Sequence, residues 1–222
     1  MAAETILTPD QQKVLDLFQA DPKLPELFYL SGGTALAEFY LKHRRSDDLD
    51  FFIDEKEFPF VAVEDFIKKL SLETGCQARF QKLYDRHMFF LQAADGKKPE
   101  LKIEFTNYPF AQLGEIKLFG RLRVDSLLDI AVNKLMAMIE RFEPKDFVDL
   151  YFLLSEHFQA SELVEGINNK FGFKIEPLTL GSELMKAQRV SFMPVMTRNL
   201  NLEELKSFFS KLAEGLKPRV IE

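Results

Sequence analysis

A pair of glycines between a predicted strand and a predicted helix places the strongest limit on what this chain can fold into. The apolar run at residues 27–30 is short enough for a buried strand, and Gly32 and Gly33 follow it closely. From Thr34 onward, apolar residues recur at helical spacing as far as the basic cluster at residues 42–45. A strand, a glycine turn and a helix in this order predict a sheet with helices packed against it.

The same glycines are candidates for binding an anion. Glycine allows a ligand to approach the backbone closely, and the first turn of a helix offers unpaired N–H groups and the positive end of the helix dipole. A phosphate could therefore bind at Gly32, Gly33 and Thr34. The alternative is a tight structural connection without a ligand. The sequence excludes the two commoner phosphate loops here, because neither a Gly-Lys-Ser/Thr ending nor GxGxxG spacing is present.

Asp48 and Asp50 form the second candidate site. They alternate with apolar residues at positions 49, 51 and 53, which is the period-two pattern of a strand. Residues two apart on a strand lie on the same face, with Cα atoms about 6 to 7 Å apart, so both carboxylates could reach one divalent cation. The alternative is that the pair forms the solvent-facing side of an edge strand.

Glu104 is the third acidic candidate. It lies in the strand-like segment at residues 101–105, where Lys102 and Glu104 share the face opposite to the apolar residues. A cross-strand ion pair is the simple interpretation. If this strand lies beside the Asp48 strand, however, three carboxylates share a small space, and their mutual repulsion requires cations to neutralise them.

The rest of the chain divides into a mixed part and a helical part. Local patterns predict helices at residues 8–20 and 61–74, followed by strands near residues 77–82, 87–93 and 101–105. Helical periodicity then covers residues 125–141, 145–157, 161–171 and 201–216. We therefore expect an α+β (mixed α/β) chain in which a mixed sheet flanked by helices occupies residues 1–122. A mainly helical domain, residues 123–222, would pack on this core.

Charge and hydropathy limit the partners. The 29 basic and 35 acidic residues give a net charge of -6, so no overall positive field attracts nucleic acid or anionic lipid. An RNA partner would need a local basic patch, for which Arg44 and Arg45 are candidates. No stretch approaches the roughly 18 apolar residues that span a bilayer, so we expect no membrane partner and a soluble, cytoplasmic protein.

The motifs in combination resemble a known family. Paired glycines, an Asp-x-Asp strand and an acid on a later strand follow the order of parts in the nucleotidyltransferase superfamily. The closer resemblance is to the AbiEii/AbiGii toxin family, and it is carried by SGGTAL at residues 31–36, HRRSDDLD at 43–50, KL at 134–135 and KDFVDL at 145–150. The interval between Gly33 and Asp48 is slightly longer than usual, and the third acid is Glu104 rather than the commoner Asp. Neither departure removes a ligand.

The resemblance implies a chemistry and a set of roles. It implies transfer of a nucleoside monophosphate from an NTP, with two Mg²⁺ or Mn²⁺ ions about 4 Å apart held by Asp48, Asp50 and Glu104. Glu104 could also help to deprotonate the attacking hydroxyl. Lys134 would contact the triphosphate; the alternative is a solvated helix lysine. Asp146 would orient Lys134 or the metal site; the alternative is that the helix dipole alone favours an acid in this first turn. The glycine turn would hold the terminal phosphates.

The resemblance also implies a biological setting, and two rival interpretations remain. Members of the family are toxins of toxin–antitoxin or phage-abortive-infection systems, so the acceptor is expected to be an RNA, tRNA included, or a protein hydroxyl, with a cognate antitoxin as partner. One rival is a non-catalytic module of the same fold that binds nucleotide or RNA. The other is a nucleotidyltransferase that modifies a small molecule.

Overall fold

The computed structural model describes residues 5–55, 57–93, 96 and 99–216. By its internal contacts the chain divides into two compact units. The first unit comprises Met1–Tyr40, Ser46–Ala111 and Glu115–Ser126, and the second comprises Leu41–Arg45, Gln112–Gly114 and Leu127–Glu222. Each unit is described by itself below. The predicted division into domains at residues 122 and 123 stays a prediction.

A seven-stranded mixed sheet forms the centre of the first unit. Its order is β3-β4-β5-β2-β1-β7-β6. The strand β1 pairs antiparallel with β2 and parallel with β7, whereas β2 pairs parallel with β5. This mixed sheet, flanked by helices, confirms the predicted fold class. The strands are β1 (Tyr29–Ser31), β2 (Leu49–Ile53), β3 (Cys76–Leu83), β4 (Arg86–Ala93), β5 (Leu101–Asn107), β6 (Lys117–Phe119) and β7 (Leu122–Val124).

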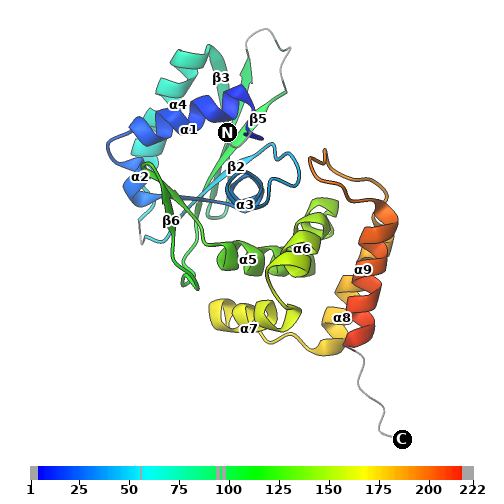
Figure 1. The fold of residues 1–222 in the computed structure, drawn as a ribbon. Helices are drawn as coiled ribbons and strands as arrows, with labels where there is room; N and C mark the ends of the chain where they lie inside the picture. The colour runs from blue at the N-terminus through cyan, green and yellow to red at the C-terminus, as the bar shows by residue number, and fades with distance from the viewer. Residues whose placement is uncertain (1–4, 56, 94–95, 97–98, 217–222) are drawn as a thin grey trace, which may run out of the picture. The chain divides into compact units, whose positions relative to one another are not determined.

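Local sequence signals fix the start of one helix and the end of another in the first unit. In α1 (Pro9–Ala20), the Thr8 hydroxyl caps the Gln11 N–H while the Gln11 side chain bonds back to the Thr8 N–H. In α4 (Phe60–Thr74), the chain leaves the helix at Gly75 in the left-handed conformation, with φ of 67°. Figure 1 shows α1 and α4 next to each other. The remaining helical segments are α2 (Leu24–Leu27), α3 (Gly32–Leu36) and the π-helix η1 (Ala37–Leu41).

Phenylalanine side chains form much of the core of this unit. Phe51 on β2 stacks on Phe18 of α1 at 4.3 Å between ring centroids and on Phe105 of β5 at 5.1 Å. These buried rings take the positions that the alternating pattern assigns to the inner face of the strands. Asp50 and Glu104, one position earlier on their strands, therefore lie on the opposite face of the sheet.

Helices make up most of the second unit. Figure 1 shows α8 and α9 next to each other, and α5 packs against both α6 and α7. In the described part of the chain, no helix is both long and apolar enough to cross a membrane. The elements are α5 (Leu127–Glu140), α6 (Pro144–Glu156), α7 (Ala160–Phe171), α8 (Pro177–Met185), the 3₁₀ helix η2 (Lys186–Arg189) and α9 (Leu202–Gly215).

Candidate active site

Strand register brings the three predicted acids of the first unit to one region of the sheet. Asp50 lies opposite Ser31 on one side and opposite Glu104 on the other. Residues paired in register extend to the same face, so Asp50 and Glu104 are direct neighbours. Asp48 lies just before β2, one-third exposed at its side chain. The structure thus places Asp48, Asp50 and Glu104 in one region of the sheet, because β2 and β5 are neighbouring strands.

Gly32 fits against Asp50 because it has no side chain. The backbone at Gly32 has φ of +72°, and a Cβ atom built there would lie 2.3 Å from Asp50 Oδ2. Any other residue would strain the backbone and collide with the carboxylate. The first glycine of the predicted anion loop is therefore also the residue that lets Asp50 lie against the start of α3.

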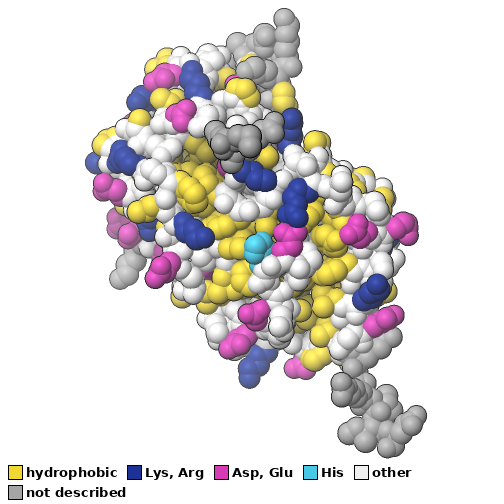
Figure 2. All heavy atoms as spheres, in the orientation of Figure 1, with side chains coloured by type: hydrophobic (Ala, Val, Ile, Leu, Met, Phe, Trp, Pro, Cys, Tyr) yellow, Lys and Arg dark blue, Asp and Glu magenta, His cyan; other side chains and the backbone are white. Residues whose placement is uncertain are grey.

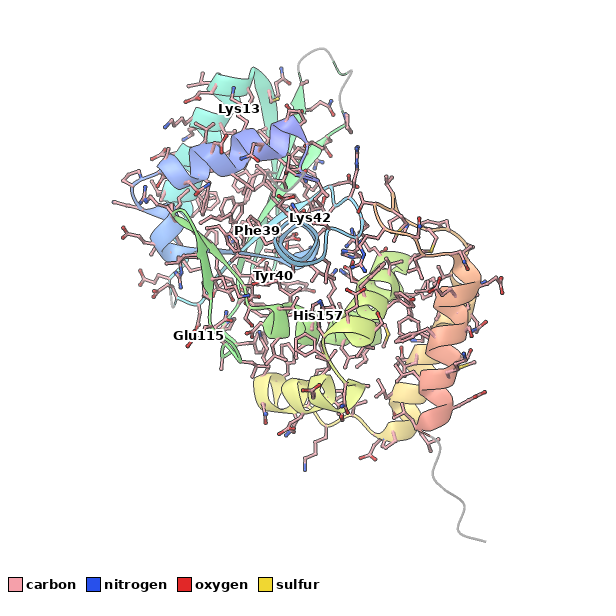
Figure 3. All side chains as sticks on the ribbon, viewed as in Figure 1. Lys13, Phe39, Tyr40, Lys42, Glu115 and His157 are labelled. Carbon is pink, nitrogen blue, oxygen red and sulfur yellow. The ribbon has the colours of Figure 1, made fainter. Side chains whose placement is uncertain are left out.

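The segment after the glycines is fixed by hydrogen bonds from three side chains. Thr34 is fully buried, and its hydroxyl donates to the Asp48 carbonyl oxygen, which joins α3 to the entry of β2. Ser31 Oγ donates to Asp125 Oδ2 at 2.7 Å, and the Tyr40 hydroxyl donates to the Asp125 carbonyl oxygen at 2.6 Å. Figure 3 labels Tyr40 and its neighbour Phe39 on this helical segment. The glycine turn is therefore held from both ends.

Two cations of the chain contact two of the clustered carboxylates. Lys102 Nζ lies 3.2 Å from Asp48 Oδ2 and 3.0 Å from Glu104 Oε2. Arg86 binds Glu104 with two nitrogens: Nε donates to Oε1 and Nη2 donates to Oε2 at 2.8 Å. Thr106 Oγ1 is a further neighbour, 3.0 Å from Glu104 Oε1. The chain itself thus supplies part of the positive charge that offsets the repulsion between the carboxylates, through Lys102 and Arg86.

These contacts shift the pKa values of the groups involved. Burial by itself would raise the pKa of Glu104, but the hydrogen bond from Arg86 and the charge of Lys102 outweigh it and lower the pKa to about 2. For Lys102, burial opposes the charge, but Asp50, Glu104 and Asp48 together raise its pKa above the ordinary value. Both groups are therefore charged at neutral pH.

Asp48 and Asp50 are a donor set that fits a hard divalent cation. Mg²⁺ in phosphoryl-transfer sites is held by one or two carboxylates together with substrate phosphates and water. The absent side chain at Gly32 leaves the Asp50 carboxylate close to the backbone at the start of α3. Among the described residues, no group of three or more His, Cys, Asp or Glu is arranged to hold a metal. The role of Glu104 as a third ligand stays a prediction.

A buried ionic cluster lies in the second unit. Lys134 on α5 is 7% exposed, and its Nζ lies 2.9 Å from Asp146 Oδ1 and 2.7 Å from Asp149 Oδ2 on α6. Arg141 Nε donates to Asp146 Oδ2 at 3.0 Å. Burial would raise the pKa of both aspartates, but Lys134 and the neighbouring arginines lower it, so the acids are ionised. Lys134 is thus not a solvated helix lysine, and the structure brings it together with Asp146.

Asp149 in the same cluster also binds the basic segment at residues 42–45. Arg44 Nε and Nη2 donate to Asp149 Oδ1 and Oδ2 at 2.6 and 2.8 Å, and His43 Nε2 lies 2.7 Å from Oδ1. Burial lowers the pKa of His43 more strongly than Asp149 raises it.

Arg44 was a candidate for contacting RNA, but the structure buries it. Arg44 is only 2% exposed, because its guanidinium is buried against Asp149, so it cannot form part of an exposed basic patch. Arg45 is exposed, and its predicted role stays a prediction. On the face drawn in Figure 2, Lys and Arg side chains are interspersed with Asp and Glu.

Two residues important to these clusters were missed as candidate site residues. Arg86 holds Glu104, and Asp149 binds three basic side chains. A signal for Asp149 was present: an acid flanked by the apolar Val148 and Leu150, three positions after Asp146 on the same helix, stands at a core position. No local signal distinguished Arg86 from a surface arginine.

Comparison with solved structures defines the class of fold. The chain is similar to JHP933 from Helicobacter pylori, with a TM-score of 0.59 and 22% identity over 92% of this chain and 89% of that one. It is also similar to MenT4, a nucleotidyltransferase toxin from Mycobacterium tuberculosis H37Rv, with a TM-score of 0.56 and 16% identity over 93% and 82% of the two chains. The fold is that of a nucleotidyltransferase.

Sequence comparison shows the family. The model of the family described as nucleotidyl transferase AbiEii toxin, type IV TA system, matches residues 15–219, and the chain belongs to this family. An uncharacterized protein of Aquifex aeolicus (strain VF5) is 34% identical over 148 residues, which are 65% of this chain and 66% of the relative's length. The resemblance that the motifs predicted is confirmed, and it places the chain among nucleotidyltransferase toxins.

Proposed function

We propose that this chain transfers a nucleoside monophosphate from an NTP to a hydroxyl group of RNA, tRNA included, with Mg²⁺ or Mn²⁺ as cofactor. The observation that supports the proposal best is the position of Asp50 between Gly32 and Glu104, with Asp48 beside them. Carboxylates next to a glycine turn are what a site for a metal-bound triphosphate requires. Membership of the AbiEii family supports the same reaction.

The proposed step is an in-line displacement at the α-phosphorus. The acceptor hydroxyl oxygen forms the new bond to the α-phosphorus while the bond from that phosphorus to the bridging oxygen of the β-phosphate breaks, and pyrophosphate leaves. Bound divalent metal supplies positive charge that offsets the charge developing on the phosphoryl oxygens. The hydroxyl proton passes to water, or to Glu104 as the family resemblance implies.

In this proposal, different residues of the chain bind the metal and the triphosphate. Asp48 and Asp50 would hold the metal, with Glu104 as a third carboxylate, and the N–H groups at Gly32, Gly33 and Thr34 would bind phosphate oxygens. Lys134 would contact the triphosphate. Asp146 and Asp149 hold its ammonium at 2.9 and 2.7 Å and so fix its position.

An α-labelled NTP experiment tests the proposal. The purified chain is incubated with Mg²⁺ and each of the four α-³²P-labelled NTPs, together with total RNA, total protein or buffer alone. We expect label in RNA for at least one nucleotide, and loss of at least 100-fold in the Asp50→Asn variant, because one of the two metal ligands is weakened. The matched control is Asp65→Asn, which removes a charge from the exposed surface of α4.

The same experiment separates the rival interpretations. Label in protein alone would replace the RNA acceptor by a protein hydroxyl, and a labelled small molecule released in a cell extract would indicate a small-molecule transferase. Absence of any transfer, with NTP binding unchanged between the wild type and Asp50→Asn, would contradict the proposal and favour a binding module.

Toxicity and a cognate antitoxin are the remaining parts of the proposal. The supporting observation is the family, whose description is that of a toxin of a type IV system. A cytoplasmic site of action follows from the proposed substrates, since NTPs and tRNA are found there. We expect induction of the wild-type chain in a bacterial host to arrest growth and induction of Asp50→Asn not to do so. Equal growth of the two cultures would contradict the assignment as a toxin.

A further inference from the structure

Lys102 is a charged residue at the proposed site to which the proposed transfer gives no role. Its ammonium lies 3.2 Å from Asp48 Oδ2 and 3.0 Å from Glu104 Oε2, so it bridges two of the three carboxylates. The side chain is 21% exposed, and Glu104 is 5% exposed. This is not a loosely solvated surface pair, because one partner is buried and both carboxylates use the same ammonium.

The position of this ammonium conflicts with metal binding at the same carboxylates. A divalent cation bound by Asp48 would lie within a few ångströms of Lys102 Nζ, and like charges at such a distance repel. The lone pair of Asp48 Oδ2 that accepts the hydrogen bond from Lys102 is also not available to a metal while that bond is made. The carboxylates therefore have two competing counter-ions, one of which is covalently part of β5.

We propose that Lys102 is an internal counter-ion that competes with the divalent metal for Asp48 and Glu104 and thereby weakens metal binding. The inference rests on the proposed function, because it concerns the same metal site. Lys102 holds Asp48 and Glu104 together, and a metal bound at Asp48 would face the repulsion of this ammonium. It is a positioning residue that acts through Asp48 and Glu104.

Arg86 does not take the same role. It holds Glu104 with two hydrogen bonds, whereas its interaction with Asp48 and Asp50 is one of charge alone among the described interactions. Its side chain is also 43% exposed, which reduces its effect on a bound ion through solvent screening. Lys102 is the cation that the structure places directly on Asp48.

Isothermal titration with Mn²⁺ alone tests the inference without any turnover. We expect Lys102→Met to bind Mn²⁺ at least tenfold more tightly than the wild type, because the competing charge is gone. Lys102→Arg retains the charge and should therefore bind Mn²⁺ less tightly than Lys102→Met does. Lys82→Met is the matched control: it removes one lysine from β3 of the same sheet, away from the carboxylates, and should leave the affinity unchanged.

The outcomes separate this inference from the proposed function. If Asp48→Asn binds Mn²⁺ as tightly as the wild type, the metal site itself is misplaced and both ideas are wrong. If binding depends on Asp48 but Lys102→Met binds no more tightly than the wild type, only the counter-ion role is overturned. Should Lys102→Met fail to fold, Lys102→Gln is titrated in its place, with the rise in melting temperature on addition of Mn²⁺ as a second readout, expected to exceed that of the wild type.

Discussion

A side chain at position 32 would meet the Asp50 carboxylate, because an ideal Cβ there lies 2.3 Å from Oδ2 and φ is +72°. We therefore expect Gly32→Ala to lower the free energy of unfolding by about 2 to 4 kcal/mol, of which the positive φ accounts for about 1 and the collision for the rest. Gly75→Ala is the matched control, since Gly75 has φ of +67° but no atom within 4 Å of the added carbon. It should cost about 1 kcal/mol.

Urea unfolding of the two alanine variants measures the difference. Equal losses at positions 32 and 75 would mean that the carboxylate moves away at little cost, and the close approach of Asp50 to the backbone would then have no energetic weight.

Asp149 is the residue on which the buried cluster of the second unit depends. It binds Lys134, Arg44 and His43, and it is fully buried. Replacing it by asparagine leaves Lys134 and Arg44 with less compensating charge, so we expect Asp149→Asn to lose about 3 to 5 kcal/mol of unfolding free energy. Glu156→Gln, which breaks the half-exposed pair with Arg198, should lose less than about 1 kcal/mol. Chemical denaturation measures the unfolding free energy of both variants. Similar losses in the two would contradict the importance assigned to Asp149.

Glu104 gives the stability a dependence on acid pH. Its folded-state pKa of about 2 lies below the ordinary value of 4.5, so its contribution is complete above pH 4.5 and is lost as the pH falls toward 2. A shift of this size corresponds to at most about 3 kcal/mol. We expect the difference in unfolding free energy between the wild type and Glu104→Gln to be largest above pH 5 and to shrink between pH 4.5 and pH 2. A difference that stays constant over this range would show that the ion pairs with Arg86 and Lys102 do not stabilise the fold.

At the scale of elements, packing between α5 and α7 requires a small residue. A Cβ at Gly166 on α7 would lie 2.4 Å from Val132 Cγ2 on α5. Although alanine favours a helix over glycine by about 1 kcal/mol, we expect Gly166→Ala to destabilise the protein by about 1 to 3 kcal/mol through overpacking. Gly181→Ala on α8 meets only an ordinary contact at 3.9 Å and should stabilise it slightly. Thermal melting of the two variants tests the contrast, and stabilisation by both would contradict the close packing of α5 and α7.

The elements that the sequence predicted are those with strong local signals. The helix α1 has a complete capping box at Thr8 and Gln11, α4 ends at Gly75, and β2 has an apolar residue at every second position, so each could be located from a few residues. The strands β6 and β7 have three residues each, which is too short for periodicity to show, and they were missed. The helix α8, which begins at Pro177, was missed as well.

The candidate site was predictable to a similar extent. Alternation put Asp50 and Glu104 on one face of their strands, and the adjacency of β2 and β5, the condition on which the cluster depended, is present in the sheet. The contacts of Arg86 and the burial of Arg44 arise from pairing between distant segments, which no local pattern encodes. Lys102 was recognised as a neighbour of Glu104 but not of Asp48.

At the scale of the whole molecule, the negative net charge opposes the binding of a negatively charged substrate, whereas a bound metal would favour it. The chain carries a net charge of -6, so the proposed RNA acceptor would have to be bound by local cations against an unfavourable overall field. The proposed metal would reduce that opposition at the site, since Asp48 and Asp50 are otherwise negative charges facing a negative substrate. Binding of RNA and of NTP is therefore expected to be coupled to metal.

A crystal structure with Mn²⁺ and a non-hydrolysable NTP tests the central claim most directly, because the anomalous signal locates the metal. The account predicts Mn²⁺ bound to carboxylate oxygens of Asp48 and Asp50, at distances of about 2.0 to 2.2 Å, with phosphate oxygens at the backbone of Gly32 and Gly33. Metal or triphosphate bound elsewhere in the molecule, with Asp48 still held by Lys102, would contradict it.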